Sequence, residues 1–173
     1  WLLAFTGARV EEAAQATVAD IRERDGITYL DINTEGEGKS LKNPGSARRV
    51  PLHPALIEEG FLRYVERLPR AGRLFPDLKA GAFGDLSAAY SKRAGRLIRD
   101  LGITDKRKVA NHSWRHRFKD LCRDAGVPKD VHDRLTGHAE GDVSGSYGSG
   151  HGLPTLAAAI RALPLPPGLI VAG

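Results

Sequence analysis

Glycine and proline residues divide the chain at short intervals, and this division limits the possible folds more than any other feature of the sequence. Gly7, Gly102 and Gly126 each follow a stretch whose apolar residues recur at helical spacing, which is the usual position of a helix-ending glycine. Pro69 and the prolines of 164–167 end two further stretches, because proline cannot continue a helix. The sequence therefore predicts a chain built mostly from short helices.

One region lacks the apolar period of a helix. Helices are expected at 1–5, 9–16, 54–67, 86–101, 112–125, 128–135 and 154–163. Between them, 26–33 and 39–51 alternate apolar and polar residues and are separated by Gly36 and Gly38, which is typical of short antiparallel strands. The predicted fold class is therefore α+β, mainly α with a small antiparallel β-sheet.

The length of 173 residues and the hydrophobic content of 41% suit a single domain over 1–173 with an ordinary core. No apolar run approaches the roughly 20 residues of a membrane-spanning helix, so no membrane association is expected. The chain starts at Trp1 and contains no Met, which predicts a fragment that lacks N-terminal residues. The single cysteine, Cys122, lies on an apolar helix stripe, which favours a buried thiol and a cytoplasmic location.

Positive charge is concentrated in one part of the chain. The formal net charge is +5, and 92–134 holds thirteen lysines and arginines against six carboxylates. A polyanion such as a phosphate backbone is a natural partner for this segment. A solvated basic face explains the same composition about equally well, so composition alone leaves both interpretations open.

Three motifs together indicate chemistry at a phosphate. They are Thr6-Gly7-Ala8-Arg9-Val10-Glu11-Glu12, His112-Ser113-Trp114-Arg115, and Gly137-His138 followed nine positions later by Tyr147. His112 and Arg115 are three residues apart and share a helix face, so both can address one anion. Arg9 and Arg115 can each donate a planar fork of hydrogen bonds to a phosphate. Zinc-ligand spacing and clustered carboxylates for magnesium are absent from the sequence, so no metal and no cofactor are expected.

The order of these motifs resembles that of the tyrosine recombinases and phage integrases, over nearly the whole chain. Thr6–Glu12 is similar to the first-arginine box of the family, with Ala8 in place of the usual Leu. The segment 41–52 resembles the strand-turn-strand that carries the family's lysine and ends in Arg-x-Pro-Leu. Lys42 is the preferred lysine and Lys39 the alternative, because the length of the turn varies.

The resemblance implies the tyrosine recombinase catalytic-domain fold and a metal-independent strand transfer on double-stranded DNA. The implied catalytic residues are Arg9, Lys42, His112, Arg115, His138 and Tyr147, with Glu12 supporting an arginine from behind. Tyr147 would attack a phosphodiester to form a 3'-phosphotyrosyl link and release a 5'-hydroxyl, which later attacks that link to rejoin the DNA. The bond energy is conserved, so neither ATP nor a cofactor is required.

The resemblance also implies partners. The family recombines DNA as a tetramer on two sites, and the helix after the tyrosine commonly docks onto a neighbouring subunit. The corresponding face here comprises Leu156, Ala159, Ile160 and Leu163. The missing N-terminal part would include a DNA-binding domain and the start of the catalytic domain. Bacterial cytoplasm, with association to the nucleoid on DNA binding, is the implied location.

Each residue of the set has an ordinary structural interpretation when it is considered alone. Arg9 can form a surface ion pair with Glu12, and Lys42 can protect a strand edge. His116, His132 and His151 are interpreted as structural, and Trp114 and Phe118 are predicted to lie in the core. Independent structural roles do not predict the correct residue types in the correct order, so the ordered set favours the functional interpretation.

Three functions fit the motifs. The leading hypothesis is a site-specific recombinase or integrase of a prophage or another mobile element. The alternatives are an inactive DNA-binding remnant of the same fold and a nicking-closing enzyme similar to type IB topoisomerases. His138 and the tail helix favour the recombinase.

Overall fold

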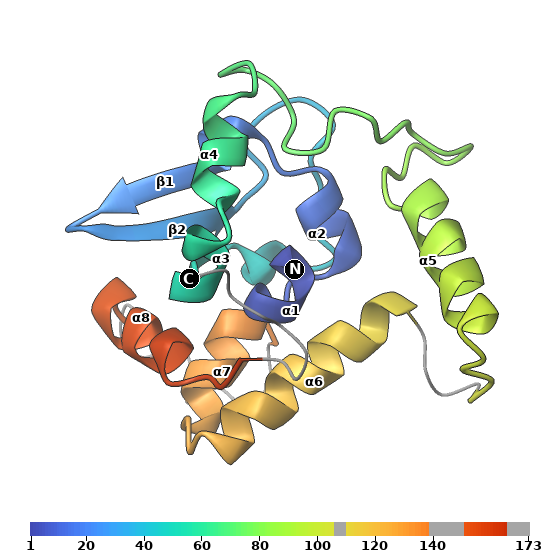
Figure 1. Cartoon of the computed structure of the whole chain (residues 1–173). Helices are drawn as coiled ribbons and strands as arrows, with labels where there is room; N and C mark the ends of the chain where they lie inside the picture. The colour runs from blue at the N-terminus through green and yellow to red at the C-terminus, as the bar shows by residue number, and fades with distance from the viewer. Residues whose placement is uncertain (106–109, 139–150, 166–173) are drawn as a thin grey trace.

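A three-stranded antiparallel sheet lies against a set of helices (Figure 1). The computed structural model describes residues 1–105, 110–138 and 151–165. The strands are β1 (Ile21–Arg24), β2 (Ile27–Ile32) and β3 (Arg48–Pro51), in the order β1-β2-β3. The α+β fold class predicted from the sequence is confirmed.

The hairpin between β1 and β2 differs from the expected pair of strands. Asp25 and Gly26 both have positive φ, of 53° and 73°, which suits a two-residue hairpin turn. Ile21 pairs with Leu30, and Leu30 pairs on its other side with Val50. Strand β1 was not predicted because its sequence, Ile-Arg-Glu-Arg, contains a single apolar residue.

The second predicted strand, 39–51, was too long. Only Arg48–Pro51 is a strand, and it is preceded by the 3₁₀ turn η2 (Pro44–Ser46). Proline fixes φ and lacks an N–H group, so the segment that contains Pro44 turns before it can pair with β2. The lysine-bearing segment is therefore mostly a loop.

The helices of the structure are short, as the glycines and prolines indicate. They are α1 (Leu2–Thr6), α2 (Val10–Ala14), α3 (Pro54–Glu58), α4 (Phe61–Glu66), α5 (Ala88–Asp100), α6 (Ala110–Asp124), α7 (Lys129–Thr136) and α8 (Leu153–Arg161), with a 3₁₀ turn η1 (Val18–Asp20). The single helix predicted at 54–67 is wrong, because Gly60 adopts a left-handed conformation with φ 88° and separates α3 from α4.

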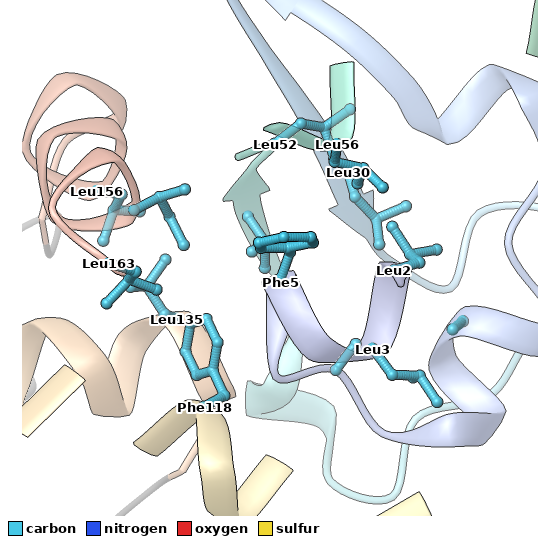
Figure 2. Packing of buried hydrophobic residues seen from close by; sticks show 14 of the residues in the cluster. Leu2, Leu3, Phe5, Leu30, Leu52, Leu56, Phe118, Leu135, Leu156 and Leu163 are labelled. Carbon is cyan, nitrogen blue, oxygen red and sulfur yellow. The ribbon is translucent and has the colours of Figure 1, made fainter. Parts of the chain in front are cut away.

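The core joins the sheet to α1, α6, α7 and α8 (Figure 2). Leu30, Phe118, Leu135 and Ile160 are fully buried there. Phe118 was correctly predicted as core. Trp114 was not, because it is 39% exposed, although it lies only four residues before Phe118 on the same helix.

Cys122 is buried on α6, as predicted, and its burial raises the pKa of the thiol to about 12. A thiol of this kind stays protonated and unreactive at neutral pH. Within the described ranges, no helix is both long and apolar enough to cross a membrane.

Helix α8 packs against β2, β3 and α7 of its own chain. Leu156, Ile160 and Leu163, three residues of the predicted docking face, are buried in this way. The His53 ring reinforces the contact: its Nδ1 accepts a hydrogen bond from the Ala55 backbone N–H, and its Nε2 lies 3.2 Å from the Leu163 carbonyl oxygen. The predicted docking face is therefore covered by the chain that carries it.

Candidate active site

The turn between α1 and α2 brings the first-arginine box against α6. Gly7 ends α1 with a left-handed φ of 60°. Its carbonyl oxygen accepts a hydrogen bond of 2.7 Å from Nη1 of Arg115. A Cβ atom at position 7 would lie 2.5 Å from Cδ1 of Phe118, so only glycine permits this approach. The glycine of the Thr-Gly-Ala-Arg motif therefore serves to seat Arg115 beside Arg9.

Arg9 precedes α2 and is held by Glu12. The backbone N–H of Arg9 donates to Oε2 of Glu12 at 2.8 Å, and its Nη1 donates to Oε1 at 2.7 Å. Its Nη2 reaches the carbonyl oxygen of Gly137, at 3.4 Å. The Arg9 side chain keeps 23% of its surface exposed, so the guanidinium is oriented by the protein and still accessible.

Arg48 on β3 is a central residue of the site that the sequence analysis did not select. Its side chain is only 1% exposed, and its Nη2 lies 2.7 Å from Oε2 of Glu12. A signal for it was present in the sequence: Val50 is buried, and alternation along a strand turns residue 48 to the same face. A buried arginine requires a carboxylate partner, but the sequence does not say which carboxylate that is.

The cluster holds more positive than negative charge. Burial alone would raise the pKa of Glu12, but the hydrogen bonds and charge of Arg48, together with Arg9, outweigh it and hold that pKa below its ordinary value. Burial, with repulsion from Arg9 and Arg48, lowers the pKa of Arg115 to about 10. Arg115 is therefore still charged at neutral pH. Among the described residues, Arg9 and Arg48 both contact the Glu12 carboxylate, and Arg115 is repelled by both arginines, an arrangement that suits the binding of an anion.

The two candidate lysines have different environments. Nζ of Lys39 lies 2.6 Å and 2.7 Å from the two carboxylate oxygens of Asp20, and both side chains are buried. It also donates to Oδ1 of Asn33 at 3.3 Å. Lys42 is exposed in the loop before η2. Because Lys39 is fixed in a structural ion pair, Lys42 remains the preferred candidate.

His112 and His138 are both exposed, on different elements. His112 lies on the first half of α6, with its ring centroid 5.5 Å from that of His116. His138 follows Gly137, which ends α7 in a left-handed conformation, and its backbone N–H donates to the Asp133 carbonyl oxygen at 3.0 Å. Tyr147 lies outside the described residues.

A polar hollow adjoins His138. It is lined by Lys119, Arg123, Gly126, Val127, Lys129, His132, Asp133 and His138. The Asp133 carboxylate bridges two lysines: its Oδ1 lies 3.1 Å from Nζ of Lys119, and its Oδ2 lies 2.9 Å from Nζ of Lys129. An apolar groove of about 410 Å³ lies elsewhere, bordered by aromatic residues that include Phe61 and Tyr64, and none of the candidate catalytic residues that the structure describes lines it. Among the described residues, no three His, Cys, Asp or Glu side chains are grouped so that they could hold a metal ion.

No protein-family model and no curated protein sequence matches this chain. Solved structures do. An integrase from mycobacterium phage Brujita superposes with a TM-score of 0.62 at 22% identity, over 94% of this chain and 50% of that one. The XerH site-specific recombinase, bound to a palindromic difH substrate, superposes with a TM-score of 0.56 at 26% identity, over 80% of this chain and 37% of that one.

The Tn1549 transposon integrase, in complex with transposon right end DNA, gives a TM-score of 0.55 at 18% identity, over 80% of this chain and 49% of that one. The chain thus spans half or less of the length of these three solved chains. All of them are integrases or recombinases, which agrees with the ordered motifs of the sequence. The chain has the tyrosine recombinase catalytic-domain fold.

Proposed function

We propose that this chain is the catalytic part of a site-specific DNA recombinase or integrase that cleaves and rejoins DNA through a 3'-phosphotyrosyl intermediate. One observation carries the proposal: Arg9 and Arg115, 106 positions apart in the sequence, bind the two glycine turns at 7 and 137 and share a site with surplus positive charge. Such a site suits a phosphate whose negative charge grows in the transition state.

The arginines would hold the non-bridging oxygens of the scissile phosphate. Each has one nitrogen engaged with a glycine carbonyl oxygen, and a guanidinium group has five N–H donors, so further donors remain for the phosphate. Fixed donors of this kind stabilise developing charge without having to reorient during the reaction. His112 and His138 would orient the phosphate or assist proton transfer.

The chemical step balances without a cofactor. The Tyr147 oxygen attacks the phosphorus atom and gives its proton to a base, for which His112, His138 or a water molecule would serve; a new P–O bond to tyrosine forms, and the bond to the 5'-oxygen breaks. Lys42 protonates that leaving oxygen, for which an exposed ammonium on a loop is well suited. Rejoining reverses these steps, and the 5'-hydroxyl displaces the tyrosine. Neither ATP nor a metal ion takes part.

Double-stranded DNA is the proposed partner, in a homotetramer. XerH and the Tn1549 integrase are both described in complex with DNA. In the tetramer, the tail helix would contact a neighbouring subunit. Because Leu156 and Ile160 are buried on their own chain, contact through this face requires α8 to leave that position or to present another surface.

The test is covalent capture on DNA. The full-length protein is incubated with a nicked suicide substrate that it binds, in EDTA, and the products are separated under denaturing conditions. A covalent adduct that disappears in Tyr147→Phe supports both the nucleophile and the metal-independent reaction. Binding without any adduct would leave the DNA-binding remnant as the better interpretation, and relaxation of supercoils without strand exchange would favour the topoisomerase-like enzyme.

A further inference from the structure

We propose that Arg48 is a positioning residue, whose buried guanidinium fixes Glu12 on one side and the turn at Gly137 on the other, and thereby sets where Arg9 and His138 meet the phosphate. The inference rests on the proposed function. Arg48 is 3% exposed, so it does not touch DNA itself.

The hydrogen bonds of Arg48 join three separate parts of the chain. Nη1 and Nη2 bind the two oxygens of Glu12, at 3.2 Å and 2.7 Å. Nε donates to the Leu135 carbonyl oxygen at 2.7 Å, near the end of α7, and Nη1 also donates to the Ser46 carbonyl oxygen at 2.9 Å. One planar group therefore fixes the distance between α2 and the end of α7.

The Gly137 turn lies directly on this guanidinium. A Cβ atom at position 137 would lie 2.6 Å from Nη1 of Arg48 and 3.0 Å from its Cζ, and the φ of Gly137 is 62°. On its other side, the Gly137 carbonyl oxygen faces Nη2 of Arg9. The contacts run from Arg48 to Glu12, from Glu12 to Arg9, from Arg9 to Gly137 and back to Arg48. Within this closed ring, Arg9 cannot move without disturbing Gly137 or Glu12.

Stability alone is a weak reason for such an arrangement. The cost of removing two charges from water offsets much of the attraction in a buried ion pair, and apolar residues of similar size can be equally stabilising. The guanidinium of Arg48 instead orients its partners. Its planar donors fix both carboxylate oxygens of Glu12, and this leaves Arg9 a single orientation. A lysine would keep the charge and lose these planar donors.

The experiment compares Arg48→Met and Arg48→Lys with Arg49→Met in the full-length protein. Arg49 is the matched control, because it is the next residue of β3 and is exposed, with its guanidinium over the Tyr29 ring. Three quantities are measured: the unfolding midpoint, the DNA affinity, and the single-turnover rate of adduct formation at saturating DNA.

We expect Arg48→Met to lower the single-turnover rate by about 10- to 100-fold, because small displacements of positioning groups have effects of this size. DNA affinity should change less than about threefold, Arg48→Lys should recover only part of the rate, and Arg49→Met should resemble the wild type. If the rate falls only in proportion to the folded fraction, or if Arg48→Lys restores it fully, Arg48 is structural and the proposal is overturned.

A second measurement does not depend on activity. Hydrogen exchange of the Arg9 side chain, followed by NMR on the folded Arg48→Lys variant, should become faster than in the wild type. Unchanged exchange would overturn the proposal even if the wild type proved inactive. If the wild type is inactive but exchange is faster in the variant, the positioning role of Arg48 stands and the proposed recombinase function is wrong.

Discussion

Two groups of arginines in this molecule carry the same charge in opposite settings. Arg9, Arg48 and Arg115 form the site cluster, in which each guanidinium is hydrogen-bonded to a carboxylate or a backbone carbonyl oxygen. Arg93, Arg96 and Arg99 are exposed on α5, a helix with no buried residue at all. Figure 1 shows α5 at the edge of the molecule, beside α6.

The two groups differ in whether the protein fixes the orientation of the guanidinium. A guanidinium in the site cluster can stabilise one particular arrangement of phosphate oxygens, because its orientation is set before DNA arrives. An exposed arginine on α5 attracts any polyanion, and salt screens that attraction. Changes in the site cluster should therefore alter the rate of reaction, and changes on α5 should alter binding.

The largest effect is expected from Arg115→Ala. Removing one preorganised donor to a developing negative charge costs about 100- to 1,000-fold in rate, so the single-turnover rate at saturating DNA should fall by that order. Arg99→Ala is the control on α5 and should change the same rate less than about twofold. Equal losses in the two variants would remove the distinction between the groups.

The next largest effect is expected on stability, from a substitution in the Gly7 turn that binds Arg115. Gly7→Ala forces a non-glycine residue into φ 60° and places a Cβ atom against the ring of Phe118. Strain and overpacking together should lower the free energy of unfolding by about 2 to 4 kcal/mol, measured by urea denaturation. Gly26→Ala is the matched control: its φ is 73°, but no atom lies within 4 Å of the added Cβ. It should lose only about 1 kcal/mol.

The third prediction is a pH dependence of stability that arises in the site cluster. The pKa of Glu12 is lower in the folded chain than its ordinary value of 4.5, because Arg48 and Arg9 outweigh the effect of burial. The stability that this carboxylate contributes is present above pH 4.5 and is lost as the pH falls through the folded pKa. Denaturation measured from pH 7 downward should show this decline.

Glu12→Gln should be less stable at pH 7, because it leaves Arg48 without a charged partner, and its stability should vary less below pH 4.5. Glu66→Gln, on the exposed side of α4, is the control and should keep the wild-type slope. An unchanged slope in Glu12→Gln would mean that other carboxylates dominate acid unfolding.

The sequence predicted the parts of the site that depend on local order. Arg9 and Arg115 could be paired because each lies in one of the recognised motifs. The fold class followed from the positions of the glycines and the spacing of the apolar residues. Arg48 could not be ranked, since its role depends on a strand register and on a carboxylate 36 positions away. Lys42 was preferred to Lys39 from the motif, but the variable length of the turn kept Lys39 as the alternative, and only tertiary structure places Asp20 beside Lys39.

The smallest effect is expected in the salt dependence of DNA binding by an α5 triple variant, Arg93→Ser, Arg96→Ser and Arg99→Ser. This variant is also the sharpest test of whether α5 contributes to binding and the site cluster to rate. Each phosphate contact contributes about 0.9 to the slope of log affinity against log salt, so losing two or three contacts should flatten the slope by about 2 to 3. The single-turnover rate at saturating DNA should not change, because these side chains lie outside the site cluster. If the slope is unaltered, α5 is a solvated face, and the charge that attracts DNA must be sought elsewhere in the molecule.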